Sequence, residues 1–263
     1  MSPMRFRSVP ILITALAFGV LYLPLLIMLV YSFIDPLAGP GSAGLTLKWY
    51  RQVMGDQQVL DSLKNSLVVG VSTTLGTTLI GTSAAIALQR SRFPGQKGIA
   101  LLTYVPLVMP EIVMGLSLLI WFVALHLVLG SFCVILAHIT FSLSYVILTV
   151  RDRLEDFDLA LEDAARDLGA TSWQAFWRVT FPLIWPAVLS GGLIAFTLSF
   201  DDFLITFFTA GVGSDTLPLH IYAMIKYGVS PEIHALSSLM IFATFLLVML
   251  FFRPEHGRSG DAG

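Results

Sequence analysis

Three carboxylic acids, Glu111, Asp201 and Asp202, lie inside long apolar stretches of this chain, and those stretches contain no lysine or arginine. A charged side chain at the centre of a membrane helix costs on the order of 2.5 to 3.5 kcal/mol, so such residues usually face a bundle interior or a water-filled path. A path lined only by acids would favour a positively charged solute. The three acids therefore indicate a cation pathway.

Each acid also has a structural interpretation, and both interpretations stay open. Glu111 follows Pro110 and could cap the positive end of a restarted helix. Asp201 and Asp202 could pair with a partner subunit rather than touch a solute. At 100° per residue the two aspartates cannot share a helix face, and Asp202 falls with Ser199 and Thr206. We favour Asp202 as the acid that lines the pore.

The composition places these acids in a membrane protein. Of the 263 residues, 56% are hydrophobic and 12% are charged, whereas an ordinary globular chain carries about 25% charge. A net charge of −2 argues against a nucleic-acid binder, and a single cysteine argues against a disulfide scaffold. Apolar runs long enough to cross a bilayer as helices predict an all-α fold with six spans, near residues 10–34, 66–88, 99–125, 132–150, 183–209 and 233–252.

The distribution of basic residues orients the predicted spans. With the amino terminus in the cytoplasm, only four of the fifteen lysines and arginines fall outside: Lys48, Arg51, Lys64 and Lys226. This bias follows the positive-inside rule. It predicts that both termini are cytoplasmic, that residues 1–252 form one membrane domain, and that residues 253–263 form a polar cytoplasmic tail.

One predicted cytoplasmic loop, residues 151–182, is longer than the others and is patterned. Apolar residues recur at helical spacing opposite the acids of the loop, and Gly169 is expected to stop this helix as a glycine cap. Ser172 is expected to cap a second short helix over 173–179, before Pro182 bends the chain into the fifth span. The apolar set is Leu154, Phe157, Leu161, Ala164, Ala165 and Leu168.

Two interpretations of this loop stay open at the level of composition. An amphipathic helix could rest on lipid, but such helices favour lysine and arginine because inner leaflets are anionic. The loop has seven acids and four arginines. An acidic amphipathic surface favours a protein partner with basic residues.

The loop also carries a motif that resembles a known signature. Asp163-Ala164-Ala165, Gly169 after three further residues, and Val179-Thr180-Phe181-Pro182 after nine more resemble the "EAA" signature of ABC importer permeases, E-A-A-x3-G-x9-I-x-L-P. The sequence departs from it by Asp for Glu at 163, Val for Ile at 179 and Phe for Leu at 181. Glu162 is an extra acid beside the motif that could replace the contact of the missing glutamate.

Other segments resemble the C-subunit permeases of spermidine/putrescine importers, over roughly residues 10 to 250. The resemblance is carried by five segments: 105–114 (VPLVMPEIVM), 138–141 (HITF), 196–202 (FTLSFDD), 216–219 (TLPL) and 228–236 (GVSPEIHAL).

The resemblance implies a type I importer (MetI-like) permease fold in a bacterial inner membrane, and inward transport of spermidine or putrescine. It implies an ABC ATPase dimer, a homologous second permease and an extracytoplasmic polyamine-binding protein as partners. Glu162, Asp163, Ala164, Ala165, Gly169 and Pro182 would belong to the segment that couples to the ATPase. The chain has no G-x4-G-K-[ST] loop, so ATP and Mg²⁺ would bind to the ATPase, and this chain would hold no cofactor.

Other functions have weaker support in the sequence. His126 and His138 are twelve residues apart with a helix break between them, which argues against a metal site, and the chain has no G-x-S-x-G element for an intramembrane hydrolase. A stand-alone channel would not need the patterned loop. A permease for another small solute remains the alternative, because related permeases keep the loop while their substrates differ.

Overall fold

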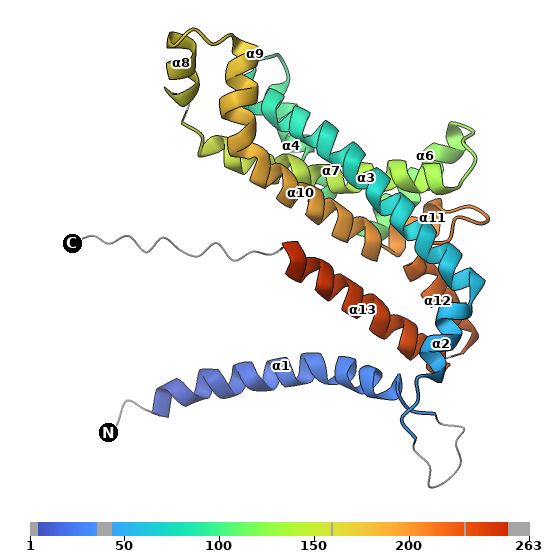
Figure 1. The fold of residues 1–263 in the computed structure, drawn as a ribbon. Helices are drawn as coiled ribbons and strands as arrows, with labels where there is room; N and C mark the ends of the chain where they lie inside the picture. Colours follow the sequence, from blue (N-terminus) through green and yellow to red (C-terminus); the bar gives the residue numbers. More distant parts are fainter. Residues whose placement is uncertain (1–4, 36–43, 159, 229, 252–263) are drawn as a thin grey trace. The chain divides into compact units, whose positions relative to one another are not determined.

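The computed structural model describes residues 5–35, 44–158, 160–228 and 230–251. Within these ranges the chain is helical, apart from turns, loops and one isolated antiparallel bridge between Ile34 and Leu45. The helices, in chain order (Figure 1), are α1 (Arg5–Tyr31), α2 (Lys48–Gly55), α3 (Gln57–Arg90), α4 (Gln96–Leu102), α5 (Val105–Val108), α6 (Glu111–Ala124), α7 (Ser131–Glu155), α8 (Ala160–Asp167), α9 (Ser172–Ala175), the π-helical turn Phe176–Thr180, α10 (Phe181–Asp201), α11 (Leu204–Thr209), α12 (Leu217–Tyr227) and α13 (Pro231–Phe251).

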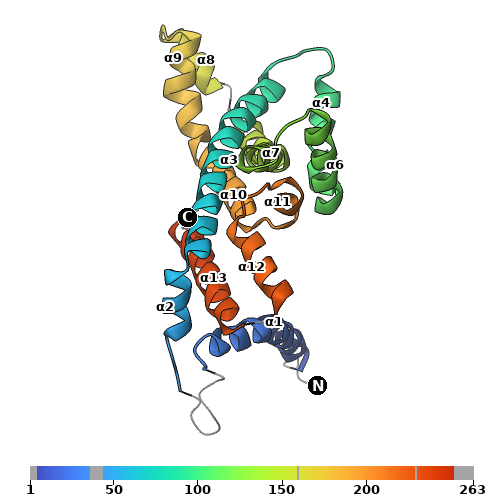
Figure 2. The same cartoon turned by 90° about the vertical axis from the view of Figure 1, so that its right-hand side faces the viewer.

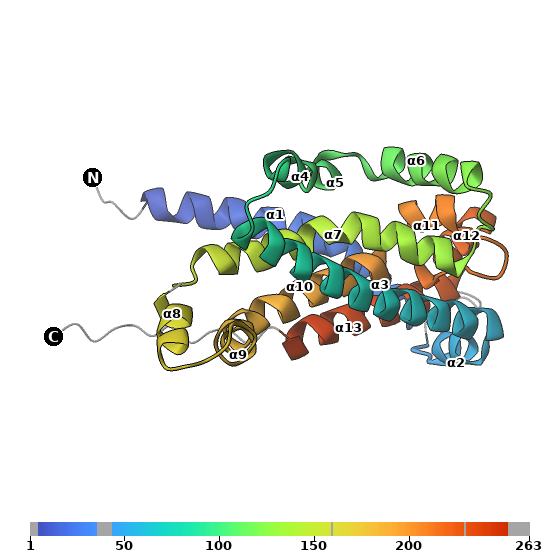
Figure 3. The same cartoon turned by 90° about the horizontal axis from the view of Figure 1, so that it is seen from above.

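The chain divides into two compact units, one of Met1–Leu60 with Ile221–Gly263 and the other of Asp61–His220. In the second unit, α7 lies between α6 on one side and α3 with α10 on the other (Figures 2 and 3). One buried apolar cluster joins α3, α7 and α10; it consists of Ala85, Leu88, Val146, Ile147, Val150, Leu154, Ile184, Val188 and Ala195.

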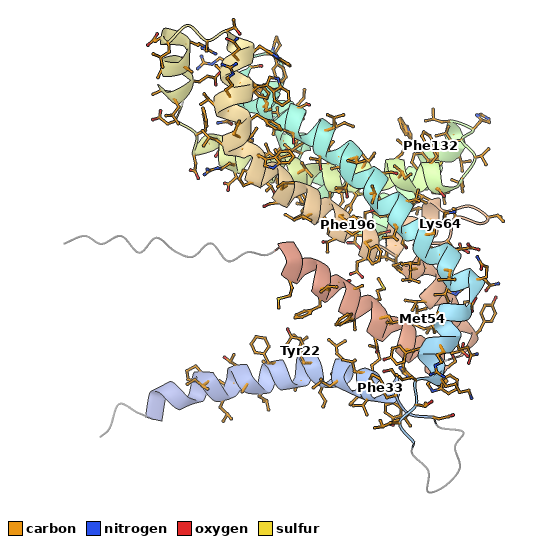
Figure 4. The ribbon with its side chains drawn as sticks, viewed as in Figure 1. Tyr22, Phe33, Met54, Lys64, Phe132 and Phe196 are labelled. Atoms are coloured by element: carbon orange, nitrogen blue, oxygen red, sulfur yellow. The ribbon has the colours of Figure 1, made fainter. Side chains whose placement is uncertain are left out.

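Small residues allow α3 and α10 to approach α7 closely. A Cβ atom at Gly81 would stand 2.9 Å from Cβ of the fully buried Val146, and one at Gly191 would stand 3.4 Å from its Cα. At the contact between α3 and α10, Gly70 of α3 faces the ring of Phe196, which projects from α10 in Figure 4. Glycine therefore permits the close helix packing that is common in membrane bundles.

A second buried cluster joins α6, α7 and α11, through Met114, Phe122, Cys133, Ala137, Phe141 and Ile205. Gly115 of α6 lies against α11, where an added Cβ would meet the ring of Phe208 at 2.8 Å. α11 is thus packed on α6 and α7 although only six residues long.

The third expected span, residues 99–125, is broken in the structure. The chain bends by 113° between Gln96–Val108 and Glu111–Ala124. Met109 and Pro110 are extended at the break, with ψ of 134° and 132°. Proline has no N–H to donate and disfavours a helical conformation at the residue before it, which explains why one continuous helix does not form here.

The fifth expected span, residues 183–209, also differs from the expectation. Its helix starts earlier, as a helical stretch over Ser172–Asp201, and stops because the next residue, Asp202, is extended with ψ of 130°. α11 then restarts the helix at Leu204. Apolar periodicity continues through residue 209, so the break was not visible in the hydrophobic pattern.

The first unit contains α1, α2 and α13. Trp49 of α2 donates its indole N–H to the Ile34 carbonyl at 3.0 Å, and Gln52 donates to Glu232 of α13 at 2.5 Å. Tyr31 at the end of α1 packs against His234, with ring centroids 6.0 Å apart. Most side chains of α1, including that of Tyr22 in Figure 4, are exposed.

Four helices in the described part of the chain are long and apolar enough to cross a membrane: Pro10–Tyr31, Gln57–Arg90, Ser131–Glu155 and Ser172–Asp201. The bent pair of Gln96–Val108 and Glu111–Ala124 makes a fifth if it is counted as one span, and Pro231–Leu246 is a shorter apolar helix. The predicted ends of the sixth span at residue 252 and of the tail at 253–263 lie outside the described residues.

Candidate functional site

The loop between α7 and α10 forms a helix, a glycine corner and a second helix, and α8 and α9 lie side by side (Figure 1). The Asp158 carboxylate accepts the Ala160 N–H at 2.9 Å at the start of α8. At its end, Ala170 donates to the Ala165 carbonyl and Gly169 donates to the Arg166 carbonyl. These are the two bonds of a Schellman motif, and Gly169 has the positive φ of +91° that the motif requires. The predicted glycine cap is present.

The second helix is capped one residue earlier than expected. The Thr171 hydroxyl accepts the Gln174 N–H, and the Gln174 side chain accepts the Thr171 N–H, which together form a capping box. Ser172 is the first residue of α9 rather than its cap. The direction of the helix changes between α9 and α10 (Figure 1), where Phe176–Thr180 forms a π-helical turn that ends two residues before Pro182.

The expected apolar stripe of the loop is wrong in part. α7 ends at Glu155 and α8 begins only at Ala160, so the apolar residues do not share one continuous helix. Leu154 is buried, whereas Leu161 is 49% exposed and Leu168 is 91% exposed. The acid-rich turn between the two helices, with Asp158 as a cap, resets the helical phase that the sequence pattern assumed.

Glu162 is the buried acid of the loop. Its Oε2 lies 2.8 Å from an Arg90 nitrogen and accepts the Thr180 hydroxyl at 3.1 Å, while its Oε1 pairs with Arg166 at 3.0 Å. Glu162 is only 5% exposed. Its carboxylate is thus satisfied within the chain, and sequence reasoning missed the Arg90 and Thr180 partners because they lie on other elements.

The other residues expected to couple to the ATPase are exposed or half-buried. The Asp163 side chain is 70% exposed and makes a 3.4 Å pair with Arg166. Ala164, Gly169 and Pro182 are exposed, and Ala165 is half-buried. Leu168, just before the corner, and Trp173, just after it, are also exposed, at 91% and 70%. The resulting acidic and apolar face has the composition of a protein-docking surface.

Asp202 lies at the helix break and is held by the chain itself. Its Oδ2 accepts the backbone N–H and the hydroxyl of Thr206 at 2.8 and 3.0 Å, and it lies 3.1 Å from His138 Nε2. His138 Nδ1 is 2.7 Å from the Ser199 hydroxyl. Asp202 is 8% exposed and His138 is 1% exposed. This network ties α7 to the end of α10 and the start of α11.

The two other acids are more accessible. Asp201, the last residue of α10, is exposed, and so is Glu111, the first residue of α6 after the bend at Pro110. Asp201 and Asp202 are consecutive in the chain, but Asp201 is exposed whereas Asp202 is buried. Neither periodicity nor spacing predicted the His138 contact to Asp202, since it joins helices distant in the sequence.

In the part of the chain that the structure describes, no group of three histidine, cysteine, aspartate or glutamate side chains is close enough to hold a metal ion.

Comparison with known families decides the class of this protein. Residues 77–253 match the family described as binding-protein-dependent transport system inner membrane component. The chain belongs to this family. The permease is 38% identical over 262 residues to the putrescine transport system permease protein PotI of Escherichia coli strain K12, covering 95% of this chain and 93% of the relative.

A second relative has the same identity. The spermidine/putrescine transport system permease protein PotC of Escherichia coli strain K12 is 38% identical over 248 residues, covering 93% of the permease and 94% of that protein. The chain is therefore related to transport permeases rather than to enzymes, and the resemblance inferred from the sequence motifs is confirmed.

Solved structures confirm the all-helical MetI-like permease fold. A chain of a bacterial ABC transporter that imports the acidic polysaccharide alginate superimposes with a TM-score of 0.73 at 17% identity, covering 96% of the permease and 99% of that chain. A chain of the MetNI methionine ABC transporter in an inward-facing conformation gives a TM-score of 0.61 at 16% identity, covering 73% of the permease and 92% of that chain. At these identities the likeness concerns the fold.

Proposed function

We propose that this permease forms part of the membrane pathway of an ATP-driven importer that carries polyamines, spermidine or putrescine, into a bacterial cell. The observation that carries the proposal is the 38% identity, over more than nine-tenths of each chain, to PotI and PotC, whose names state putrescine and spermidine/putrescine transport. Related substrates are expected where the whole permease, and not only the loop motif, is shared.

The permease works in an assembly with an ABC ATPase dimer, a homologous second permease and an extracytoplasmic binding protein. An alginate transporter with a similar fold has a bound periplasmic protein, which supports the last of these. ATP and Mg²⁺ are held by the ATPase. The assembly lies in the bacterial inner membrane.

The corner around Gly169 is the surface that couples the permease to the ATPase. Asp163, Ala164, Leu168 and Trp173 are exposed there, and an exposed acid beside exposed apolar side chains suits a groove with a basic residue at its edge. Glu162 supports this surface from within the chain rather than contacting the ATPase.

The three acids give the pathway its preference for cations. Asp201 and Glu111 are accessible and contact the passing amine groups, while the buried Asp202 contributes its charge from behind Asp201 and fixes the helix break. Carboxylates in a site with few waters offset part of the hydration that a polyamine loses.

The transport cycle is alternating access. ATP closes the ATPase dimer, the coupling corners of the two permeases move together, and the pathway opens outward to receive the polyamine from the docked binding protein. Hydrolysis reopens the pathway to the cytoplasm. The permease makes and breaks no covalent bond in this cycle.

Uptake by intact cells tests the substrate. Cells that lack other polyamine importers and express the complete assembly should take up labelled putrescine, and unlabelled spermidine should compete while lysine should not. Asp201→Asn should slow uptake about tenfold if it removes about 1.4 kcal/mol at the rate-limiting barrier. Strong competition by lysine, or by an uncharged solute, at equal membrane abundance would assign the permease to another substrate.

A further inference from the structure

Arg90, the last residue of α3, contacts the cytoplasmic loop at three places. Its guanidinium carbon lies 5.6 Å from the ring centroid of Phe157, before α8. Its two terminal nitrogens lie 2.8 Å from the Glu162 carboxylate in α8 and 3.3 Å from the Thr180 hydroxyl in the π-helical turn after α9. One side chain of α3 therefore contacts the loop on both sides of the coupling corner.

These contacts are buried and mutually satisfied. Thr180 is fully buried, and it donates its hydroxyl hydrogen to Glu162 Oε2 while it accepts a hydrogen from Arg90. Arg90 itself is largely covered, with 22% of its side chain exposed. Breaking a buried pair by removing one partner leaves an uncompensated charge, and this is far more costly than the loss of a surface pair.

The rest of α3 is packed against the helices of the pathway. Ala85 and Leu88, five and two residues before Arg90, belong to the buried cluster with Val146 of α7 and Val188 of α10. Closely packed cores have low compressibility and transmit displacement. A movement of α8 that pulls on Arg90 therefore passes into all three helices.

We propose that Arg90 is a positioning residue for energy coupling: through buried Glu162 and Thr180 it fastens the ATPase-docking corner to α3, so that movement of the corner is converted into movement of the pathway. This inference rests on the proposed function. The proposal gives two neighbouring acids different roles. Glu162 joins the corner to α3, while the exposed Asp163 faces the ATPase. Arg166 differs from Arg90 because, among the described residues, it pairs with Glu162 and Asp163, which both belong to α8 itself.

The test uses the complete importer in liposomes and measures polyamine transported per ATP hydrolysed. Arg90→Gln and Glu162→Gln should each lower this ratio at least threefold, and the double variant should be no worse than either single variant because the two residues act through one contact. Arg90→Lys should retain more polyamine transport per ATP hydrolysed than Arg90→Gln does. The control is Arg92→Gln, because Arg92 is an exposed arginine two residues further along, and it should behave as wild type.

A distance measurement separates positioning from loss of fold. Spin labels at the exposed positions Arg92 and Asp167, in a background with the buried Cys133 replaced by alanine, should give a narrow distance distribution in the wild-type complex and a broad one in Arg90→Gln. A wild-type ratio and an unchanged distribution in Arg90→Gln would overturn the role of Arg90. If the unaltered importer moved no polyamine, the proposed substrate would be wrong, and the distance distribution would still test Arg90.

Discussion

At the scale of single residues, neighbouring acids of this permease have opposite surroundings. Asp202 is enclosed by His138 and by the first turn of α11, whereas Asp201 is exposed. Glu162 is buried against Arg90, whereas Asp163 is exposed. In both pairs one acid holds helices together and its neighbour is accessible to a ligand or partner. Charge alone could not distinguish them, because the difference depends on side chains from other helices.

The first prediction concerns the stability contributed by Asp202. Asp202→Ala removes the acceptor for the Thr206 backbone N–H, and a buried polar group left unpaired costs about 1 to 3 kcal/mol. It also breaks the contact with His138 Nε2, which keeps the Thr206 hydroxyl at 3.0 Å. The purified importer should unfold at a lower temperature in a detergent thermal melt. The matched control is Asp201→Ala, which should melt close to wild type because Asp201 is exposed. Equal melting temperatures for the two variants would contradict a structural role for Asp202.

At the scale of elements, the sequence predicted local features better than features that depend on distant contacts. The Gly169 cap was predictable because a positive φ at a helix end is a local requirement, and Pro106 and Pro110 signalled the restart at Glu111 although the span was assigned as continuous. The break at Asp202 was not predictable, since the polar partners that stabilise it include His138, 64 residues away. The family resemblance, carried by the loop motif, indicated the fold without any information on contacts between helices.

The second prediction tests the glycine corner. Gly169→Val places a β-branched side chain at a φ of +91°, at a cost of roughly 1 kcal/mol or more. Stimulation of ATP hydrolysis by the loaded binding protein should fall, and less ATPase should copurify with the permease. Gly169→Asn is the control, because asparagine tolerates the left-handed conformation; it should retain most of the stimulation. Full stimulation and copurification in the valine variant would show that the corner does not need this conformation.

The third prediction tests the contact between α3 and α7. Gly81→Ala places a Cβ 2.9 Å from Cβ of Val146, which is fully buried, so the helices must shift. Overpacking of this kind typically costs 1 to 3 kcal/mol, and the melting temperature of the solubilised importer should fall. Gly98→Ala in α4 should cause little change, because nothing lies within 4 Å of its added Cβ. A destabilisation that is equal at both positions would argue against close packing at Gly81.

At the scale of the whole molecule, the exposed surface of the helices is largely apolar, as expected of a protein surrounded by lipid. The membrane-spanning window of α1 has no buried residue, and many large apolar side chains of the other helices are also exposed. Helices suit this environment because all their backbone polar groups are satisfied internally. The bias of lysine and arginine between the predicted loops predicts how the spans are oriented.

The fourth prediction is the orientation itself, with six crossings and both termini in the cytoplasm. Single cysteines at Met54 and Asp215 should react with a membrane-impermeant maleimide in intact cells, whereas cysteines at Arg92 and Asp152 should react only after permeabilisation. All four positions are exposed, and Cys133 is replaced by alanine in each variant. Labelling of the cysteine at Arg92 in intact cells would show that the second and third spans have the opposite orientation.

The most direct test of the central claim is accumulation of labelled putrescine and spermidine in proteoliposomes that contain the permease, its partner permease and the ATPase. With the binding protein outside and ATP supplied at the ATPase face, the label should accumulate inward above its external concentration, and omission of either ATP or the binding protein should abolish accumulation. The permease with Asp163→Lys should remain in the membrane but lose most of this uptake. Equilibration of polyamine without ATP, or ATP-driven accumulation of a different solute and not of polyamine, would contradict the account.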